Sequence, residues 1–255
     1  CGCDLRGDKT FLMAHVRSGY PGWRPPIQSV STGHPGRSGP DKIPNIAQRM
    51  MLVMKANAVV FTAPNTVSYQ AVDCPDPEPN QVVVHVTHSW ISNGTEGSFL
   101  RGERIDGDTA YRKGDPWPFP IVAGYQKIGV VEWVGDRIAD LEVGETVFAT
   151  MGAVNGMFKP RGGQISPSIG GREGIWKLPE GIDPLAFSGM VLTQVGYNCG
   201  ARPALATGEG AVVIGDGMVG QWAAQTLAWR GAHVALVGRH DDRLAKFKTG
   251  PTCHT

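Results

Sequence analysis

The feature that most constrains this chain of 255 residues is the placement of three glycines, Gly215, Gly217 and Gly220, between two different sequence periodicities. The run before them, "GAVVIG", is short, apolar and β-branched, which is typical of a buried strand. The run after them, "MVGQWAAQTLAWRG", has apolar residues at helical spacing, and a second strand-like run, "HVALVG", follows. The pattern therefore predicts a strand, a tight turn, a helix and a parallel strand in one βαβ unit.

The spacing G-x-G-x-x-G in this context predicts a binding site for the diphosphate of a dinucleotide. Gly215 permits a tight turn, Gly217 lets the backbone approach the phosphates, and Gly220 lets the helix pack closely on the strand. The helix N-terminus adds unpaired N–H groups and a positive dipole end. We predict cofactor contacts from these glycines and from Met218 and Val219. The alternative is a glycine-rich turn with no ligand.

The residues after the second strand bear on the choice of cofactor. Proteins that bind NAD place Asp or Glu at this strand end, where it accepts a hydrogen bond from the ribose 2′-hydroxyl. Here Gly238, Arg239 and His240 follow the strand, and an arginine suits a 2′-phosphate. Asp241 offers the NAD-type contact in another register, and a solvated loop charge is the third interpretation of Arg239. We predict NADP(H), with NAD(H) as the alternative cofactor.

Residues 54–183 have the pattern of an all-β region. Runs rich in β-branched residues lie between Pro, Gly, Asp and Asn turn signals, which is typical of a barrel or sandwich. These runs read "NAVVFT", "TVSYQAV", "QVVVHVTHSWIS", "KIGVVEWVG" and "ETVFAT". Residues 101–120 are predicted as a long polar loop. From Pro184 the spacing is helical as far as Gly200, and residues 184–255 contain two recognisable strands, at "GAVVIG" and "HVALVG".

Composition separates residues 1–53 from the rest of the chain. This segment is rich in Pro, Gly and Ser and has too little apolar surface to offset the entropy of ordering, so we expect a disordered arm or a spurious leader before Met54. The net charge of +1 gives no reason to expect a nucleic-acid partner, and no apolar run is long enough to predict a membrane span. Five cysteines without paired spacing predict reduced thiols in a cytoplasmic protein.

Together these segments resemble the medium-chain dehydrogenase/reductase superfamily. The resemblance covers about residues 54–248 and includes "PFPIVAGYQKIGVVEWVG", "LEVGETVFA", "KLPEGIDPLAFSGM" and "GEGAVVIGDGMVGQ", in the family's order. The segment "SNGTE" resembles a zinc-lacking branch that includes bacteriochlorophyllide a dehydrogenase. The resemblance implies an α/β fold with a β-barrel. A GroES-like barrel domain (54–183) would precede an incomplete Rossmann-type, doubly wound nucleotide-binding domain (184–255).

The sequence departs from the zinc-dependent members of that family. Those members carry a Cys in a Cys-x-Thr-Asp-like segment, then Gly-His-Glu, and a third ligand further on. Here Ser92 is near the place of the cysteine, Tyr125 is at the histidine and Gln126 is at the glutamate. The four-cysteine lobe that holds structural zinc is also missing. Hydroxyl, phenol and amide groups are poor zinc ligands, so we predict no zinc.

Without a metal, hydrogen-bond donors and a proton relay must hold the reacting oxygen of a substrate. Tyr125 is a candidate donor that passes a proton, and Ser92 and Thr95 are candidate relay hydroxyls. Glu96 is a candidate base, or an anchor that accepts backbone N–H groups. The alternatives are structural, with Ser92, Asn93 and Thr95 as turn formers and Tyr125 as barrel packing with a satisfied hydroxyl.

Other side chains carry weaker expectations. Four aromatic residues are predicted as core, with an apolar substrate cleft or ordinary surface positions as the alternatives, namely Trp90, Trp117, Phe119 and Trp133. Three arginines of the long loop are predicted as solvated charges in preference to contacts for an acidic substrate, namely Arg101, Arg104 and Arg112.

We therefore predict a zinc-independent, NADP(H)-preferring oxidoreductase that acts on a small alcohol, ketone or enone and forms a homo-oligomer when full length. Two strands are visible where a doubly wound domain needs about six, so the chain is predicted to be truncated and inactive by itself. The alternative is a nucleotide-binding regulatory or scaffold protein of the same fold that lacks catalytic groups.

Overall fold

Antiparallel β-structure dominates the first part of the computed structural model, which describes residues 54–254. The segment predicted to be disordered or spurious, 1–53, lies outside the described residues. All five predicted runs form strands, which are β1 (Met54–Ala63), β2 (Thr66–Cys74), β3 (Gln81–Ser89), β7 (Lys127–Val134) and β8 (Thr146–Ala149). The β1–β2 hairpin turns at Asn65, whose φ is +56°, a conformation that asparagine tolerates.

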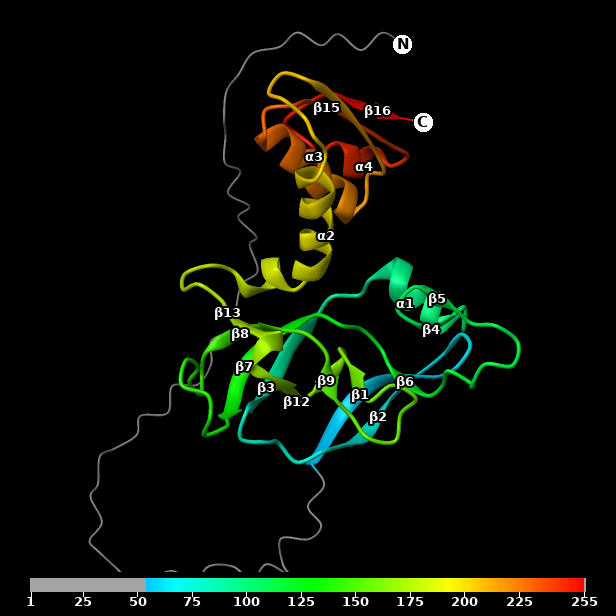
Figure 1. The fold of residues 1–255 in the computed structure, drawn as a ribbon, viewed down its shortest axis with the longest axis vertical. Helices are drawn as coiled ribbons and strands as arrows, with labels where there is room; N and C mark the ends of the chain where they lie inside the picture. The colour runs from blue at the N-terminus through cyan, green and yellow to red at the C-terminus, as the bar shows by residue number, and fades with distance from the viewer. Residues whose placement is uncertain (1–53, 255) are drawn as a thin grey trace, which may run out of the picture. The chain divides into compact units, whose positions relative to one another are not determined.

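Two sheets are completed by short strands that the sequence did not predict. One sheet has the order β11–β1–β2, with β6 also paired to β1, and the other has the order β12–β3–β7–β8–β13. The antiparallel strands curl into a half-barrel, which fits the expected GroES-like barrel domain (Figure 1). A period of two is not recognisable in such short segments. The short strands of the first sheet are β6 (Ile121–Val122) and β11 (Ile165–Ser166), and those of the second are β12 (Ser168–Gly171) and β13 (Ile175–Lys177), with the 3₁₀ turn η2 (Arg172–Gly174) between them. Strands β9 (Gly152–Ala153) and β10 (Arg161–Gly162) pair with each other in a separate two-stranded sheet.

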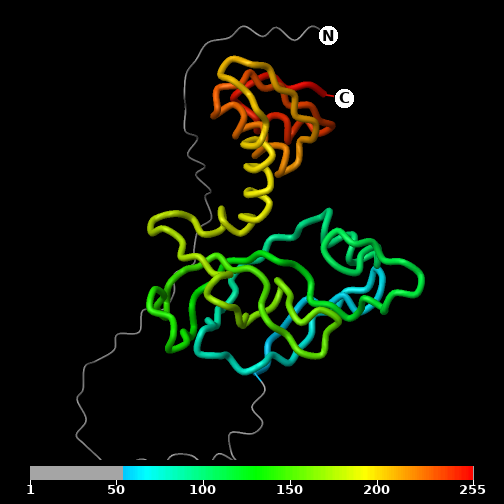
Figure 2. Tube along the Cα trace, viewed as in Figure 1, coloured from blue at the N-terminus to red at the C-terminus, as the bar shows by residue number. Residues whose placement is uncertain are grey.

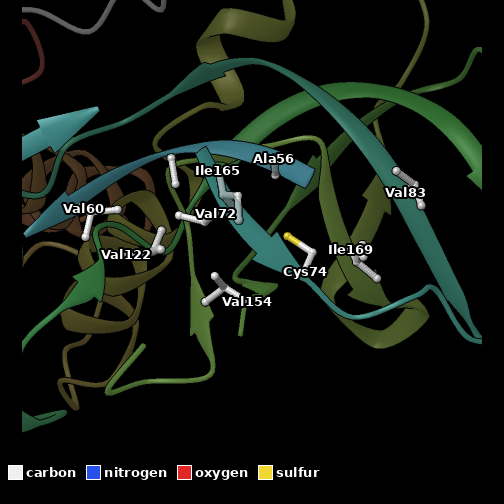
Figure 3. Close-up of a cluster of buried hydrophobic side chains, with 10 residues drawn as sticks. Ala56, Val60, Val72, Cys74, Val83, Val122, Val154, Ile165 and Ile169 are labelled. Carbon is white, nitrogen blue, oxygen red and sulfur yellow. The ribbon is translucent and has the colours of Figure 1, made fainter. Parts of the chain in front are cut away.

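The interior of this region is filled by small and β-branched side chains. Figure 3 shows one cluster, in which Val60, Cys74 and Ile169 are each no more than 1% exposed. A second cluster joins Val82, Val131 and other side chains of β3, β7 and β8. β-branched side chains pack well on a pleated sheet, which explains why the runs chosen by composition are the strands that surround the core.

Two expectations between residues 92 and 120 were wrong. "SNGTE" is not a turn, because Ser92 is the N-cap of helix α1 (Asn93–Leu100). The segment 101–120 is not entirely loop, because β4 (Arg104–Asp106) and β5 (Thr109–Ala110) form a small hairpin around Gly107. Gly107 has φ +46°, the left-handed conformation that a tight hairpin needs and that glycine adopts without strain.

The second part of the described chain contains the predicted βαβ unit. A 3₁₀ turn, η3 (Pro184–Phe187), precedes α2 (Met190–Ala201), so the predicted helix starts later and ends one residue beyond Gly200. The unit itself is β14 (Gly210–Ile214), α3 (Met218–Trp229) and β15 (His233–Gly238), with β14 and β15 parallel. Figure 2 follows the chain from the antiparallel strands through α2 into this unit.

The prediction of only two strands in this region was wrong. Residues Thr252–His254 form a third strand, β16, which pairs in parallel with β15 and gives the order β14–β15–β16. The short helix α4 (Asp241–Leu244) connects β15 to β16 (Figure 1). The sequence "TCH" is too short and too polar to carry a strand signal by itself. Its pairing is instead determined by the neighbouring strand β15.

Helix α3 packs against both the parallel sheet and helix α2. Ala224 and Leu227 of α3 are buried with Val234 and Leu236 of β15 in one apolar cluster. On α2, a side chain at Gly200 would come within 2.6 Å of the Ala223 carbonyl oxygen, so only glycine allows this helix contact.

Within residues 54–254, no helix has the length and apolar character required to cross a membrane.

Candidate functional site

The predicted diphosphate-binding turn lies at the carboxyl end of β14. Gly215 follows the strand with φ +123°, which is accessible to glycine and strained for other residues, and its N–H donates to the Val237 carbonyl oxygen at 2.8 Å. Gly217 is the N-cap of α3, so Met218, Val219 and Gly220 form the first turn of that helix. The first N–H groups of a helix have no acceptor within it, which makes them available to an anion.

The other two glycines have distinct geometric roles. A Cβ at Gly220 would lie 1.8 Å from the Gly215 carbonyl oxygen, so this glycine is required for the close approach of helix and turn. A Cβ at Gly217 would meet nothing within 4 Å, and its φ of −74° is open to any residue. Gly217 therefore serves no packing purpose in the described residues, and the space beside it is open to a ligand. These features fit the diphosphate of a nicotinamide dinucleotide.

The residues after β15 include the predicted determinants of cofactor choice. Arg239 is exposed immediately beyond the strand, and Asp241 is exposed as the first residue of α4. The sequence analysis did not give a role to Asp216, which occupies the variable position between the first two glycines. Asp216 is buried and its carboxylate accepts hydrogen bonds from the N–H groups of Arg239 and His240. The two loops that border the adenosine ribose in such folds are thus joined by one side chain.

A second cluster gathers the catalytic candidates of the barrel around Glu96. The buried Glu96 carboxylate accepts a hydrogen bond from the Ser92 N–H at 2.7 Å through Oε1 and another from the Gln164 amide through Oε2. Burial raises the pKa of Glu96, although both hydrogen bonds act to lower it. Both oxygens are engaged, so the geometry supports the anchor interpretation of Glu96, in which it ties the start of α1 to Gln164.

Ser92 and Thr95 are placed by the same helix. Ser92 is buried at the N-cap, but its side chain does not cap the helix. The Thr95 carbonyl oxygen accepts a hydrogen bond from the Ser98 hydroxyl at 2.8 Å. Both residues begin a helix rather than form a turn, because Glu96 reaches back to the Ser92 N–H and satisfies a donor at the helix start.

Tyr125 and Gln126 lie between β6 and β7. Tyr125 is half-buried in a bend that belongs to no strand. Gln126 is fully buried, and its Oε1 accepts a hydrogen bond from the Val191 N–H of α2 at 3.0 Å. Its Nε2 is buried and has no hydrogen-bond partner among residues 54–254. The main-chain oxygen of Gln126 also accepts from the Trp90 N–H.

Lys127, which the sequence analysis overlooked, is fully buried at the start of β7. Its Nζ donates to the Gly163 carbonyl oxygen at 2.9 Å. Burial lowers the pKa of Lys127 to about 7, against a smaller opposing effect of Cys74. A lysine at the head of the β-branched run "KIGVV" is the sequence signal that could have identified it, because lysine is almost never fully buried without a partner.

These side chains do not suit a catalytic zinc ion. Among the described residues, no three His, Cys, Asp or Glu side chains come together as a possible metal site. Ser92, Tyr125 and Gln126 offer a hydroxyl, a phenol and an amide, and Glu96 is already engaged by two donors. The chemistry of this donor set does not match the thiolate, imidazole and carboxylate ligands that zinc prefers.

The remaining sequence candidates lie mainly at the surface. Phe119 is buried as predicted, whereas the expectation of core positions for the tryptophans was wrong, with exposed fractions of 41% for Trp90, 54% for Trp117 and 36% for Trp133. Large indole rings often remain partly exposed. Two of the loop arginines are paired locally, Arg101 with Glu103 and Arg104 with Asp108. Local pairing accounts for these charges without an acidic substrate.

Sequence comparison identifies relatives over part of the chain. The chain is 32% identical over 118 residues to 2-desacetyl-2-hydroxyethyl bacteriochlorophyllide A dehydrogenase from Cereibacter sphaeroides, which is 41% of this chain and 33% of the relative. The chain thus spans about a third of the length of that enzyme. No protein-family model matches the sequence.

Comparison of folds reaches further along the chain. One neighbour is a dehydrogenase from Sinorhizobium meliloti, described as a zinc-binding one and bound to NADP, with a TM-score of 0.61, 18% identity and coverage of 79% of this chain and 62% of the neighbour. Another is an alcohol dehydrogenase from E. coli complexed with NADH, with a TM-score of 0.63, 21% identity and coverage of 79% and 62%. At these identities the likeness establishes the fold, which combines a barrel with a Rossmann-like sheet.

Proposed function

We propose that this chain, whose relatives and structural neighbours are medium-chain, zinc-type alcohol dehydrogenase-like oxidoreductases, is an NAD(P)-dependent oxidoreductase. The observation that carries the proposal is the turn from β14 to α3, in which Gly215 has φ +123° and the space beside Gly217 is open. A bound nicotinamide dinucleotide supplies the hydride chemistry. The chain supplies N–H groups of residues 218–220 that bind its diphosphate.

The proposed cofactor is NADP(H), with NAD(H) as the competing ligand. Support comes from the exposed Arg239 directly after β15 and from the absence of a carboxylate at the strand end itself, where Gly238 stands. A guanidinium binds a phosphate with two charge-assisted hydrogen bonds, whereas a ribose hydroxyl gains less from it. Under this cofactor preference, Asp241, which is exposed at the start of α4, makes no contact with the ribose of the cofactor.

The proposed reaction is hydride exchange between the cofactor and a small alcohol, ketone or enone, without zinc. In the reducing direction, the carbonyl carbon gains the hydride and its oxygen gains a proton from a donor of the protein. Tyr125 is the proposed donor because it is half-buried beside Gln126, at the position that the resemblance assigns to a metal ligand. Ser92 and Thr95 are proposed to relay that proton, and Glu96 to hold the start of α1 in place.

A screen of carbonyl compounds and enones tests this proposal, with NADPH consumption at 340 nm as the readout. For a protein that contains this chain and has the full length of its relatives, the proposal expects turnover of at least one compound class and no loss of rate after dialysis against a zinc chelator. Binding of NADPH with no turnover of any compound would instead support a regulatory or scaffold protein. Failure to bind either dinucleotide would contradict both interpretations.

A further inference from the structure

Asp216 is the only carboxylate among the described residues that connects the diphosphate-binding turn to the segment after β15. Its Oδ2 accepts hydrogen bonds from the Arg239 N–H at 2.8 Å and from the His240 N–H at 2.7 Å. The His240 ring nitrogen Nδ1 lies 2.9 Å from the same oxygen. The Asp216 side chain is only 7% exposed. One oxygen therefore draws two consecutive backbone N–H groups toward the interior.

The glycine at the end of β15 is matched to this carboxylate. A Cβ at Gly238 would lie 2.5 Å from both Cβ and Oδ2 of Asp216, which is closer than real contacts allow. Asp216 thus fills the space that a side chain at the end of β15 would use. An acidic residue at Gly238, as NAD binders have at this strand end, is incompatible with Asp216 in its present position.

Basic groups surround this point at the carboxyl ends of the parallel strands. Arg239 is exposed, and the Arg243 guanidinium lies 3.7 Å from Oδ1 of Asp216. The His254 ring nitrogen Nε2 of β16 lies 2.9 Å from the Arg239 carbonyl oxygen. Asp241 and Asp242 are exposed in the first turn of α4 and add negative charge nearby. Charge alone therefore does not determine what this edge binds, and the placement of Arg239 matters.

We propose that Asp216 is a positioning residue for cofactor specificity, which holds the backbone of Arg239 and His240 so that the Arg239 side chain meets the 2′-phosphate of NADP(H). This inference rests on the proposed NADP(H) preference. It assigns the role to the hydrogen-bond geometry of Asp216 rather than to its charge. Asparagine in place of Asp216 keeps an oxygen that accepts from both N–H groups, whereas alanine removes it.

The experiment compares Kd for 2′,5′-ADP and 5′-AMP, which differ by the 2′-phosphate alone, by calorimetric titration of the full chain. The wild type is expected to favour 2′,5′-ADP by about tenfold or more, as one charge-assisted contact provides. Asp216→Asn is expected to keep that preference, while Asp216→Ala and Gly238→Ala reduce it to about twofold or less. Asp242→Asn also removes one negative charge, but Asp242 is exposed and does not accept the hydrogen bonds of the Arg239 and His240 N–H groups, so this variant is the matched control.

The outcomes separate the inference from the proposed function. If the wild type does not favour 2′,5′-ADP, the NADP(H) preference is wrong and the inference falls with it. If the wild type favours 2′,5′-ADP and Arg239→Ala loses this preference but Asp216→Ala retains it, the preference stands and the positioning role is wrong. Equal weakening of both ligands by Asp216→Ala, with an unchanged ratio, also contradicts the positioning role, because a purely structural loss affects both alike.

Discussion

The Nζ of Lys127 donates a hydrogen bond to the carbonyl oxygen of Gly163 at 2.9 Å in the interior of the barrel region. The segment that contains Gly163 is held from several sides, since the N–H groups of Gly163 and Gln164 both donate to the Ala123 carbonyl oxygen. The Gln164 side chain in turn donates to Glu96. The buried Lys127 amine and the buried Glu96 carboxylate therefore bind two consecutive residues, Gly163 and Gln164, next to the bend that contains Tyr125.

Lys127 makes stability depend on pH. Its pKa is lowered to about 7 in the folded state, so between about pH 7 and its ordinary value of 10.5 the unfolded chain binds the extra proton. The lysine contribution to stability is therefore lost as pH falls from 10.5 toward 7 and is constant below that. From pH 7 to pH 9, the free energy of unfolding of the wild type is expected to increase relative to that of Lys127→Met by roughly 2 kcal/mol.

Urea denaturation of both proteins at the two pH values measures this difference. Lys113→Met, at an exposed position of the 101–120 segment, is the matched control and is expected to show no such change. A pH-independent difference between the wild type and Lys127→Met would mean that the buried amine does not titrate in this range.

Two glycines of the turn should respond differently to alanine. Gly220→Ala places a methyl group 1.8 Å from the Gly215 carbonyl oxygen and is expected to destabilise the fold by about 2 kcal/mol or more. Gly217→Ala meets no atom within 4 Å, so stability should change by less than about 1 kcal/mol. The added methyl instead occupies space proposed for the diphosphate, so NADPH affinity should fall by about tenfold or more. Thermal unfolding and NADPH titration of both variants separate the two effects.

Tyr125→Phe tests the proposed proton donor. The variant keeps the ring and loses the hydroxyl, so kcat for the best substrate of the screen is expected to fall by about 10²-fold or more, with NADPH binding unchanged. Tyr69→Phe, at a position that is 74% exposed on β2, is the matched control and should retain the wild-type rate. Equal rates for Tyr125→Phe and Tyr69→Phe would remove Tyr125 from the mechanism.

Glu96→Gln tests the anchor. The carboxylate accepts from the Ser92 N–H and from the Gln164 amide, and a glutamine presents an N–H₂ group to one of these donors. We expect a loss of about 1–3 kcal/mol in the free energy of unfolding, the usual cost of leaving a buried donor unpaired. Equilibrium denaturation measures it. The double change Glu96→Gln with Gln164→Glu, which restores a complementary pair, is expected to recover part of the loss; if it recovers none, the two side chains do not act as a pair.

The sequence predicted those parts of the fold that depend on local pattern. The βαβ unit was predicted because a β-branched strand, three spaced glycines and an amphipathic helix each carry a local signal. The five long strands of the barrel region were predicted for the same reason. β16 was missed because "TCH" acquires its strand conformation from pairing with β15, which is a tertiary effect. Helix α1 was missed because its start depends on Glu96 reaching back to Ser92.

The candidate site was predictable only where chemistry follows from residue type. The turn glycines were named correctly as a motif, but Asp216 sits at a variable position of that motif and acquires its role from Gly238, Arg239 and His240. Lys127 contacts the Gly163 carbonyl oxygen across 36 positions of sequence, and Glu96 contacts Gln164 across 68 positions, through pairing that no local pattern encodes. Contacts between residues so far apart in the sequence can be identified only from the folded structure.

The most direct test of the account is a crystal structure of the chain grown with NADPH. We predict diphosphate density over the N–H groups of residues 218–220, with the adenosine ribose and its 2′-phosphate beside Arg239. Diphosphate density elsewhere on the protein, or clear density for the turn with none for the cofactor at saturating NADPH, would contradict the proposed function.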